Sequence, residues 1–342
     1  MLKEKIEKAK NVVFPVTGGI GRNIFFTGVI KNFKKQYPDK KLFVVAGTPE
    51  VFFNNPKITR VYGFSMLHHF YEDYVHNNAE TVILEVEPYR HPSYLAGEEH
   101  IVRCWCDLLE IECEDIVPEL FFTRNEREMA EAHMKKQKKP TILLQHVGGK
   151  LPDHNEKQDQ ISSLSSMYRR NLRDKVVQEV VDQLIEDGYQ VSSVQGNTQF
   201  CPDKAEKLFI PIRALMALIP YVSGAICIDS FLQHATAALG VPSLVLWAGT
   251  NPQKLGYGMH KNLRRAVCSS PECHRPNSYA FDVQPNGMLW DCPFNDACID
   301  YESKTIIEGF KEMKGEEYAN CVKNFVSPEQ KKEIKENCDK CK

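Results

Sequence analysis

The chain has 342 residues, about the length of two average domains; 42% are hydrophobic, 26% are charged, and the formal net charge is −2. This balance is typical of globular proteins and excludes wholesale disorder, collagen and coiled coils. So small a net charge attracts neither nucleic acid nor an anionic membrane. Apolar runs fall well short of the roughly 20 residues that span a bilayer, and the start is a polar helix. We therefore expect a cytoplasmic protein without a transmembrane segment.

The twelve cysteines are unevenly distributed along the chain. In a cytoplasmic protein they favour free thiols or a metal site over a disulfide framework. Two close pairs stand in the last quarter of the sequence, Cys268-x₄-Cys273 and Cys292-x₅-Cys298, in a segment rich in Pro, Asn and Gly. Four thiolates at such spacing favour a closed tetrahedral metal site, with unrelated thiols as the alternative.

The first half of the sequence alternates strand and helix patterns. Residues 11–16 form an apolar run that ends in a glycine turn, and a helical pattern then runs to Pro38. A second apolar strand covers residues 41–46. Strand, turn, helix and strand make a βαβ unit, which requires a parallel sheet. Further strands are expected at 60–63 and 81–86.

The second half repeats this alternation. Strands are expected at 141–145, 189–194, 224–228 and 242–247, with helices at 172–187, 212–221 and 231–239. We predict an α/β protein with two Rossmann-like parallel-sheet domains, 1–135 and 136–265, that face each other across a cleft. A Cys-rich finger over 266–300 and a helical tail over 301–342 would follow. Parallel sheets of this kind bind ligands at their carboxyl edges.

The first candidate site is the turn that contains Gly18, Gly19 and Gly21. Its backbone N–H groups and the following helix N-terminus can hold an anion. It does not match a dinucleotide fingerprint, because Ile24 stands where the third glycine should be and no acidic residue closes the second strand. NAD binding is therefore a minor alternative, and a tight turn that merely needs glycine is another.

A second candidate site lies where the strand at 224–228 meets the next helix. Asp229 and Ser230 come at the strand end, and His234 falls on the first turn of the helix. A hydroxyl, helix-terminal amides and an imidazole suit a phosphate. The alternative is that His234 only packs in the core.

The pattern Asp-Ser-x-x-x-His-x-x-Ala-Ala-x-Gly-x-Pro242, followed by Trp247-Ala-Gly-Thr-Asn-Pro252, resembles the signature of the ADP-heptose heptosyltransferase-like glycosyltransferases, family 9. The resemblance covers about residues 11 to 255 and implies a GT-B fold. It also implies inverting sugar transfer from a nucleotide diphosphate without a metal at the phosphates.

By this resemblance Ser230 and His234 would hold the diphosphate beside Asp229, and Thr250 would lie near the nucleotide. A basic residue would offset the charge. We favour Arg170 over Lys150 and Arg169 for that role.

The sequence departs from the family at the glycine turn, where Arg22 replaces an Asp that is taken as the base. Arginine cannot act as a base near neutral pH. Three explanations are open: another carboxylate acts as the base, the chain has lost transfer activity, or Arg22 binds an anionic group of the donor or the acceptor. Glu85 and Glu87, after the strand at 81–86, are the candidate substitutes, and Glu87 is favoured.

The cysteine pairs are similar to the four-cysteine iron finger of glycosyltransferases that modify autotransporters, which favours iron over zinc at Cys268, Cys273, Cys292 and Cys298. We expect a nucleotide-diphosphate sugar donor, a glycan or protein acceptor and no nucleic acid, and an oligomer is compatible with the sequence. The alternative function is a non-catalytic module that binds a sugar nucleotide or nucleic acid and carries a structural metal finger.

Overall fold

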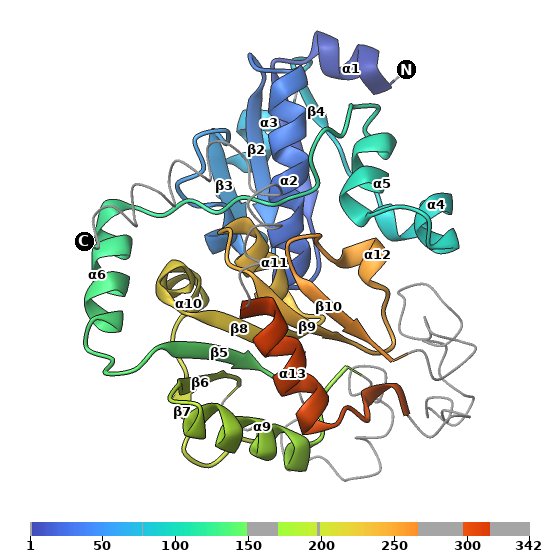
Figure 1. Ribbon diagram of the computed structural model, residues 1–342. Helices are drawn as coiled ribbons and strands as arrows, with labels where there is room; N and C mark the ends of the chain where they lie inside the picture. The colour runs from blue at the N-terminus through green and yellow to red at the C-terminus, as the bar shows by residue number, and fades with distance from the viewer. Residues whose placement is uncertain (1, 77, 149–169, 197–198, 266–296, 315–342) are drawn as a thin grey trace, which may run out of the picture. The chain divides into compact units, whose positions relative to one another are not determined.

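The computed structural model describes residues 2–76, 78–148, 170–196, 199–265 and 297–314 (Figure 1). The chain forms two compact units. The first unit comprises Met1–Glu128 with Ile212–Ala217, and the second comprises Met129–Pro211 with Leu218–Lys342. The domain limits expected from the sequence stay a prediction.

The first unit is built on a four-stranded parallel sheet with the order β3-β2-β1-β4. Its strands are β1 (Asn11–Val16), β2 (Lys41–Ala46), β3 (Arg60–Gly63) and β4 (Thr81–Ile83). Its helices are α1 (Leu2–Lys8), α2 (Ile20–Gln36), α3 (Phe70–Tyr74), α4 (Pro92–Ala96) and α5 (Ile101–Leu108), and α6 (Arg124–Met134) begins in it. Short 3₁₀ helices cover Pro49–Phe52 and Pro88–Arg90.

Aromatic side chains hold α2 on this sheet. Phe14 of β1 meets Phe26 and Phe33 of α2 edge-on, with ring centroids 5.3 and 5.2 Å apart. All three rings are buried, and such contacts add to the free energy of burial. The packing fixes where α2 begins, and thus the glycine turn before it.

The second unit contains a six-stranded parallel sheet with the order β10-β9-β8-β5-β6-β7. The strands are β5 (Thr141–Gln145), β6 (Gln190–Val194), β7 (Glu206–Leu208), β8 (Gly224–Ile228), β9 (Ser243–Trp247) and β10 (Lys261–Arg264). Its helices are α9 (Asp174–Glu186), α11 (Phe231–Ala238), α12 (Pro252–Leu255) and α13 (Ser303–Lys314), whereas α10 (Ile212–Leu218) belongs to the first unit up to Ala217. Residues Ile219–Tyr221 and Ala297–Ile299 are 3₁₀-helical.

The central strands of this sheet are buried along their whole length, which is why their sequences are continuous apolar runs. Side chains of α9 and α13 join Ile226 and Leu244 in one hydrophobic core, which includes Ile306 and Phe310 of α13. Part of the expected helical tail is thus a core element of the second unit.

The α/β fold class with two parallel-sheet domains is confirmed. One strand is shorter than expected, because β4 ends at Ile83 and not at Val86. Within the described ranges, no helix combines the length and the apolar character needed to cross a bilayer.

Candidate functional site

The carboxyl edge of the second sheet carries a polar cluster where β8 meets α11. Ser230 is the N-cap residue of α11, but its side chain makes no cap hydrogen bond. The side chain of Gln145, at the end of β5, caps the helix instead: its Oε1 accepts from the N–H of Leu232 (3.3 Å), and its Nε2 donates to Ser230 Oγ (3.1 Å). Gln145 therefore fixes both the hydroxyl and the first turn of the helix.

Arg170 lies against the same junction. Its Nη1 donates to the backbone carbonyl of Asp229 (3.0 Å), and its side chain is partly exposed. The Asp229 carboxyl is buried and accepts from Gln233 Nε2 (3.1 Å). Burial raises the pKa of Asp229, and the positive charge of Arg170 opposes that rise. Asp229 is thus an internal anchor, and Arg170 is the cation of the cluster.

The backbone after β5 passes close to this cluster at Gly148. A Cβ at that position would lie 3.2 Å from Ile228 Cδ1, 3.6 Å from Ser230 Oγ and 3.8 Å from Arg170 Cζ. The Gly148 N–H donates to Asn171 Oδ1 (2.9 Å). Glycine here keeps the space beside the hydroxyl and the guanidinium open.

Two other predicted donor residues lie deeper. His234 is buried; its Nδ1 is 2.8 Å from the Tyr257 hydroxyl, and its Nε2 is 3.4 Å from Gln233 Nε2. Thr250 is buried after β9, and its hydroxyl lies near enough to Asp229 to lower the pKa of that carboxyl. The structure therefore brings Arg170, Asp229, Ser230 and Thr250 together, whereas His234 faces Tyr257 and its role stays a prediction.

The glycine turn of the first unit lies between β1 and α2, as expected. Gly18 needs to be glycine, because it has φ +89° and a Cβ there would come within 2.9 Å of Arg22 Cδ. Gly19 is the N-cap of α2, and Asn23 Nδ2 donates to its carbonyl (2.8 Å). Gly21 is in the first turn of α2. Anion binding at Gly19 and Gly21 stays a prediction.

Arg22 and Glu87 form an ion pair, with Arg22 Nη1 3.1 Å from Glu87 Oε2. The guanidinium carbon of Arg22 lies 5.4 Å from the ring centroid of Tyr89 and 5.1 Å from that of Trp105, and only 13% of its side chain is exposed. Glu87 Oε1 accepts from the Tyr89 N–H (3.1 Å) and caps the 3₁₀ helix that follows. Glu85 is exposed on the loop after β4. Both carboxylates lie beyond the strand, because β4 is short.

The predicted metal finger lies mostly outside the described residues, which exclude Cys268, Cys273 and Cys292 and also the basic candidates Lys150 and Arg169. Cys298 is described, and it is buried in the 3₁₀ helix 297–299. Across the described part of the chain, no group of three or more His, Cys, Asp or Glu side chains is placed to hold a metal ion. The finger stays a prediction.

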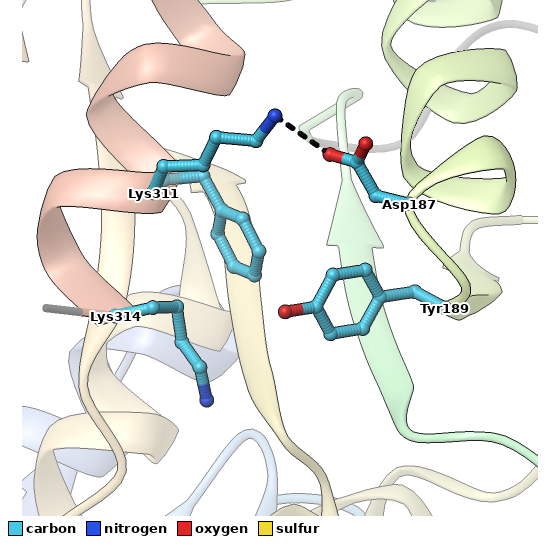
Figure 2. A pocket seen from close by; sticks show the side chains of 5 residues that line it. Asp187, Tyr189, Lys311 and Lys314 are labelled. Atoms are coloured by element: carbon cyan, nitrogen blue, oxygen red, sulfur yellow. Dashed lines mark ion pairs between the residues drawn. The ribbon is translucent and has the colours of Figure 1, made fainter.

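The second unit also has a pocket of about 410 Å³, shown in Figure 2. Asp187, Tyr189, Phe310, Lys311 and Lys314 line it, and Lys311 pairs with Asp187 (2.9 Å). Tyr189 directly precedes β6, so the pocket lies at the amino end of that strand. In a parallel sheet this is the edge opposite to Asp229 and Ser230, so the pocket is separate from the predicted site.

Residues 178–281, which belong to the second unit except for Ile212–Ala217, match the family model of glycosyltransferase family 9 (heptosyltransferase). This match confirms the resemblance drawn from the sequence, and the chain is a glycosyltransferase. A comparison with curated proteins gives no match.

The fold is similar to that of three solved structures. A family 9 glycosyltransferase from Veillonella parvula has 13% identity and a TM-score of 0.63, with 89% of this chain and 97% of that chain covered. The ADP-heptose lipopolysaccharide heptosyltransferase II of E. coli has 12% identity and a TM-score of 0.62, with 89% and 98% covered. The iron-containing heptosyltransferase TibC of enterotoxigenic E. coli, in complex with ADP-D-β-D-heptose, has 11% identity and a TM-score of 0.61, with 92% and 77% covered.

Proposed function

We propose that the protein transfers a sugar from a nucleotide-diphosphate donor to a hydroxyl acceptor with inversion, and that the donor is ADP-linked heptose. The observation that supports this most is the cluster at the carboxyl edge of the second sheet. There a partly exposed arginine, a serine hydroxyl and the N-terminus of α11 meet beside Gly148. The family match over the same unit and the donor named for TibC support the choice of sugar nucleotide.

In this proposal the second unit stabilises the departing diphosphate. Arg170 provides the positive charge, Ser230 a hydroxyl donor, and α11 its N-terminal dipole. Gln145 keeps both the hydroxyl and the helix start in place before the donor arrives. Because these groups are already fixed by protein contacts, little reorganisation is needed as negative charge develops on the leaving group.

Glu87 is the proposed base in the first unit. It would take the proton from the acceptor hydroxyl as that oxygen forms its bond to the anomeric carbon and the bond to the diphosphate breaks. Arg22 replaces the family's carboxylate and cannot take the proton itself. Its ion pair with Glu87 instead fixes the direction of that carboxylate. Glu85 is the second candidate.

The test is donor turnover with and without acceptor. ADP-heptose, UDP-glucose and GDP-mannose are each offered with lipopolysaccharide core glycans or with proteins, and the release of nucleoside diphosphate is measured. We expect more nucleoside diphosphate to be released from ADP-heptose than from the other two donors, and we expect NMR of the product to show the inverted anomer. Equal turnover of all donors, or retention at the anomeric carbon, would contradict it.

A structural metal in the Cys finger, iron rather than zinc, is also proposed, with no metal at the diphosphate. Elemental analysis of the purified protein tests the first point, and turnover in the presence of a chelator tests the second. Oligomerisation and a cytoplasmic location belong to the same proposal, and native mass spectrometry and cell fractionation test them.

A further inference from the structure

Two cysteines of the first unit are brought together by the chain reversal that ends α5. The carbonyl of Cys106 accepts from the N–H groups of Leu109 (3.1 Å) and Ile111 (3.0 Å), and Glu110 between them has φ +56°. This reversal brings the residues after Ile111 back beside the carboxyl end of α5. As a result Cys113 lies close enough to Cys106 for each thiol to shift the pKa of the other.

The two thiols have different surroundings. Cys106 is fully buried, whereas Cys113 is partly exposed. Asn32 Nδ2 of α2 lies 3.9 Å from Cys113 Sγ, and Arg103 Nη1 of α5 donates to the Cys113 carbonyl (3.3 Å). Reagents from solvent therefore meet Cys113 first.

The surroundings of the pair lower the pKa of the Cys113 thiol from its usual value. The hydrogen bond from the Cys106 thiol lowers the pKa of Cys113 most, and Arg103 and Lys31 lower it further, against the effects of burial and of Asp115. The same hydrogen bond and burial raise the pKa of Cys106. A partly exposed cysteine with a lowered pKa beside a buried partner thiol is the arrangement found in redox-sensitive cysteines.

We propose that Cys113 and Cys106 are a redox-sensitive dithiol, in which hydrogen peroxide oxidises Cys113 and Cys106 then closes a disulfide with it. The Cys113 thiolate attacks one peroxide oxygen, the O–O bond breaks, and hydroxide leaves a sulfenic acid behind. Cys106 then attacks the Cys113 sulfur, the S–O bond breaks, and the Cys106 proton leaves with the oxygen as water. This modification site does not depend on sugar transfer.

The test maps cysteine oxidation by peptide mass spectrometry. The protein is treated with hydrogen peroxide, free thiols are blocked, and the peptides are separated without reduction. We expect a Cys106–Cys113 cross-link that lacks two hydrogen atoms. In Cys106→Ser the sulfenic acid on Cys113 should persist and react with dimedone. The matched control is Cys104→Ser, because Cys104 is buried in the same helix and burial raises its pKa to about 11.

A second readout uses the wild-type chain and so does not depend on the folding of a variant. Iodoacetamide should alkylate Cys113 about tenfold faster than Cys104 at pH 7.5, because only a thiolate reacts. Oxidation of other thiols without the Cys106–Cys113 link, or equal alkylation of Cys113 and Cys104, would overturn the proposal.

Discussion

Replacing Arg170 by Met tests the proposed diphosphate site at its cation. The substitution keeps a long side chain but removes the guanidinium that donates to the Asp229 carbonyl and faces the space beside Gly148. The matched control is Arg173→Met. Arg173 is only three residues further along the chain, but its side chain is half exposed and pairs with Asp300 on the surface.

The expected size of the effect follows from the chemistry of the contact. A hydrogen bond to a charged group contributes roughly 1.5–3 kcal/mol. Its loss therefore weakens nucleotide binding roughly 10- to 150-fold. Loss of the guanidinium's hydrogen bond to the Asp229 carbonyl destabilises the fold by up to roughly 1.5–3 kcal/mol. This is less than the roughly 5–15 kcal/mol by which native proteins are stable, so the variant should stay folded. Removal of the nearby positive charge also raises the pKa of Asp229 further above its usual range.

Isothermal titration calorimetry with ADP measures the effect, at low and at high salt. The wild-type dissociation constant should rise with salt, and that of Arg170→Met should be higher and less salt-dependent. Arg173→Met should bind like the wild type. Unchanged ADP affinity in folded Arg170→Met, or an equal loss in Arg173→Met, would refute the assignment of Arg170.

Three further predictions concern the base, an ion pair and a buried histidine. Glu87→Gln should slow sugar transfer roughly 10²–10⁴-fold without changing the affinity for ADP, and Glu85→Gln should transfer at the wild-type rate. The reverse pattern would identify Glu85 as the base. Arg213→Ala should lower the free energy of unfolding in urea by about 3 kcal/mol, because the nearly buried guanidinium pairs with Glu126 and donates to two backbone carbonyls. The control Arg124→Ala removes an exposed ion pair and should cause no measurable change, so equal effects of the two variants would contradict this prediction. Burial lowers the pKa of His260 from 6.5 to about 4, so between these values the unfolded chain binds more protons than the folded chain. The contribution of His260 to stability is therefore full above pH 6.5 and falls by roughly 1 kcal/mol per pH unit from there down to about pH 4, and buried His146 adds a slope of the same sign. In urea titrations His260→Gln should reduce the total slope, and an unchanged slope would exclude His260 as one of its sources.

Local signals were sufficient to predict much of the second unit from sequence. The apolar run before Asp229, the serine at the helix start and the closing Gly240 identify a strand, an N-cap and a helix end without any tertiary information. The choice of Arg170 among three basic residues agrees with its place beside Ser230, although its role in donor binding is still a prediction.

Gln145 was missed because its function depends on contacts with residues 85 and 87 positions away. One signal was available in the sequence: the polar Gln145 follows three apolar residues, 142–144, at the carboxyl end of a strand, where such sheets place ligand-binding groups. Gly148 was missed for the same reason, since the tight contact that a Cβ there would make is with Ile228 Cδ1 (3.2 Å), which is distant in the sequence.

The Arg22–Glu87 pair joins residues 65 positions apart, so no local pattern could predict it. The sequence suggested Glu87 from a strand end, but β4 ends four residues earlier, and Glu87 is fixed by capping the 3₁₀ helix that begins at Pro88. Glu87 was therefore selected on the basis of an incorrect strand boundary. Its ion pair with Arg22 is the observation that now supports it as the proposed base.

The most direct test of the proposed donor site is a crystal structure of the protein with bound ADP. We predict that the diphosphate lies within hydrogen-bond distance of Ser230 Oγ and the Arg170 guanidinium, at the N-terminus of α11. Phosphates bound elsewhere, for example in the lysine-lined pocket at the start of β6, would contradict the assignment of the donor site.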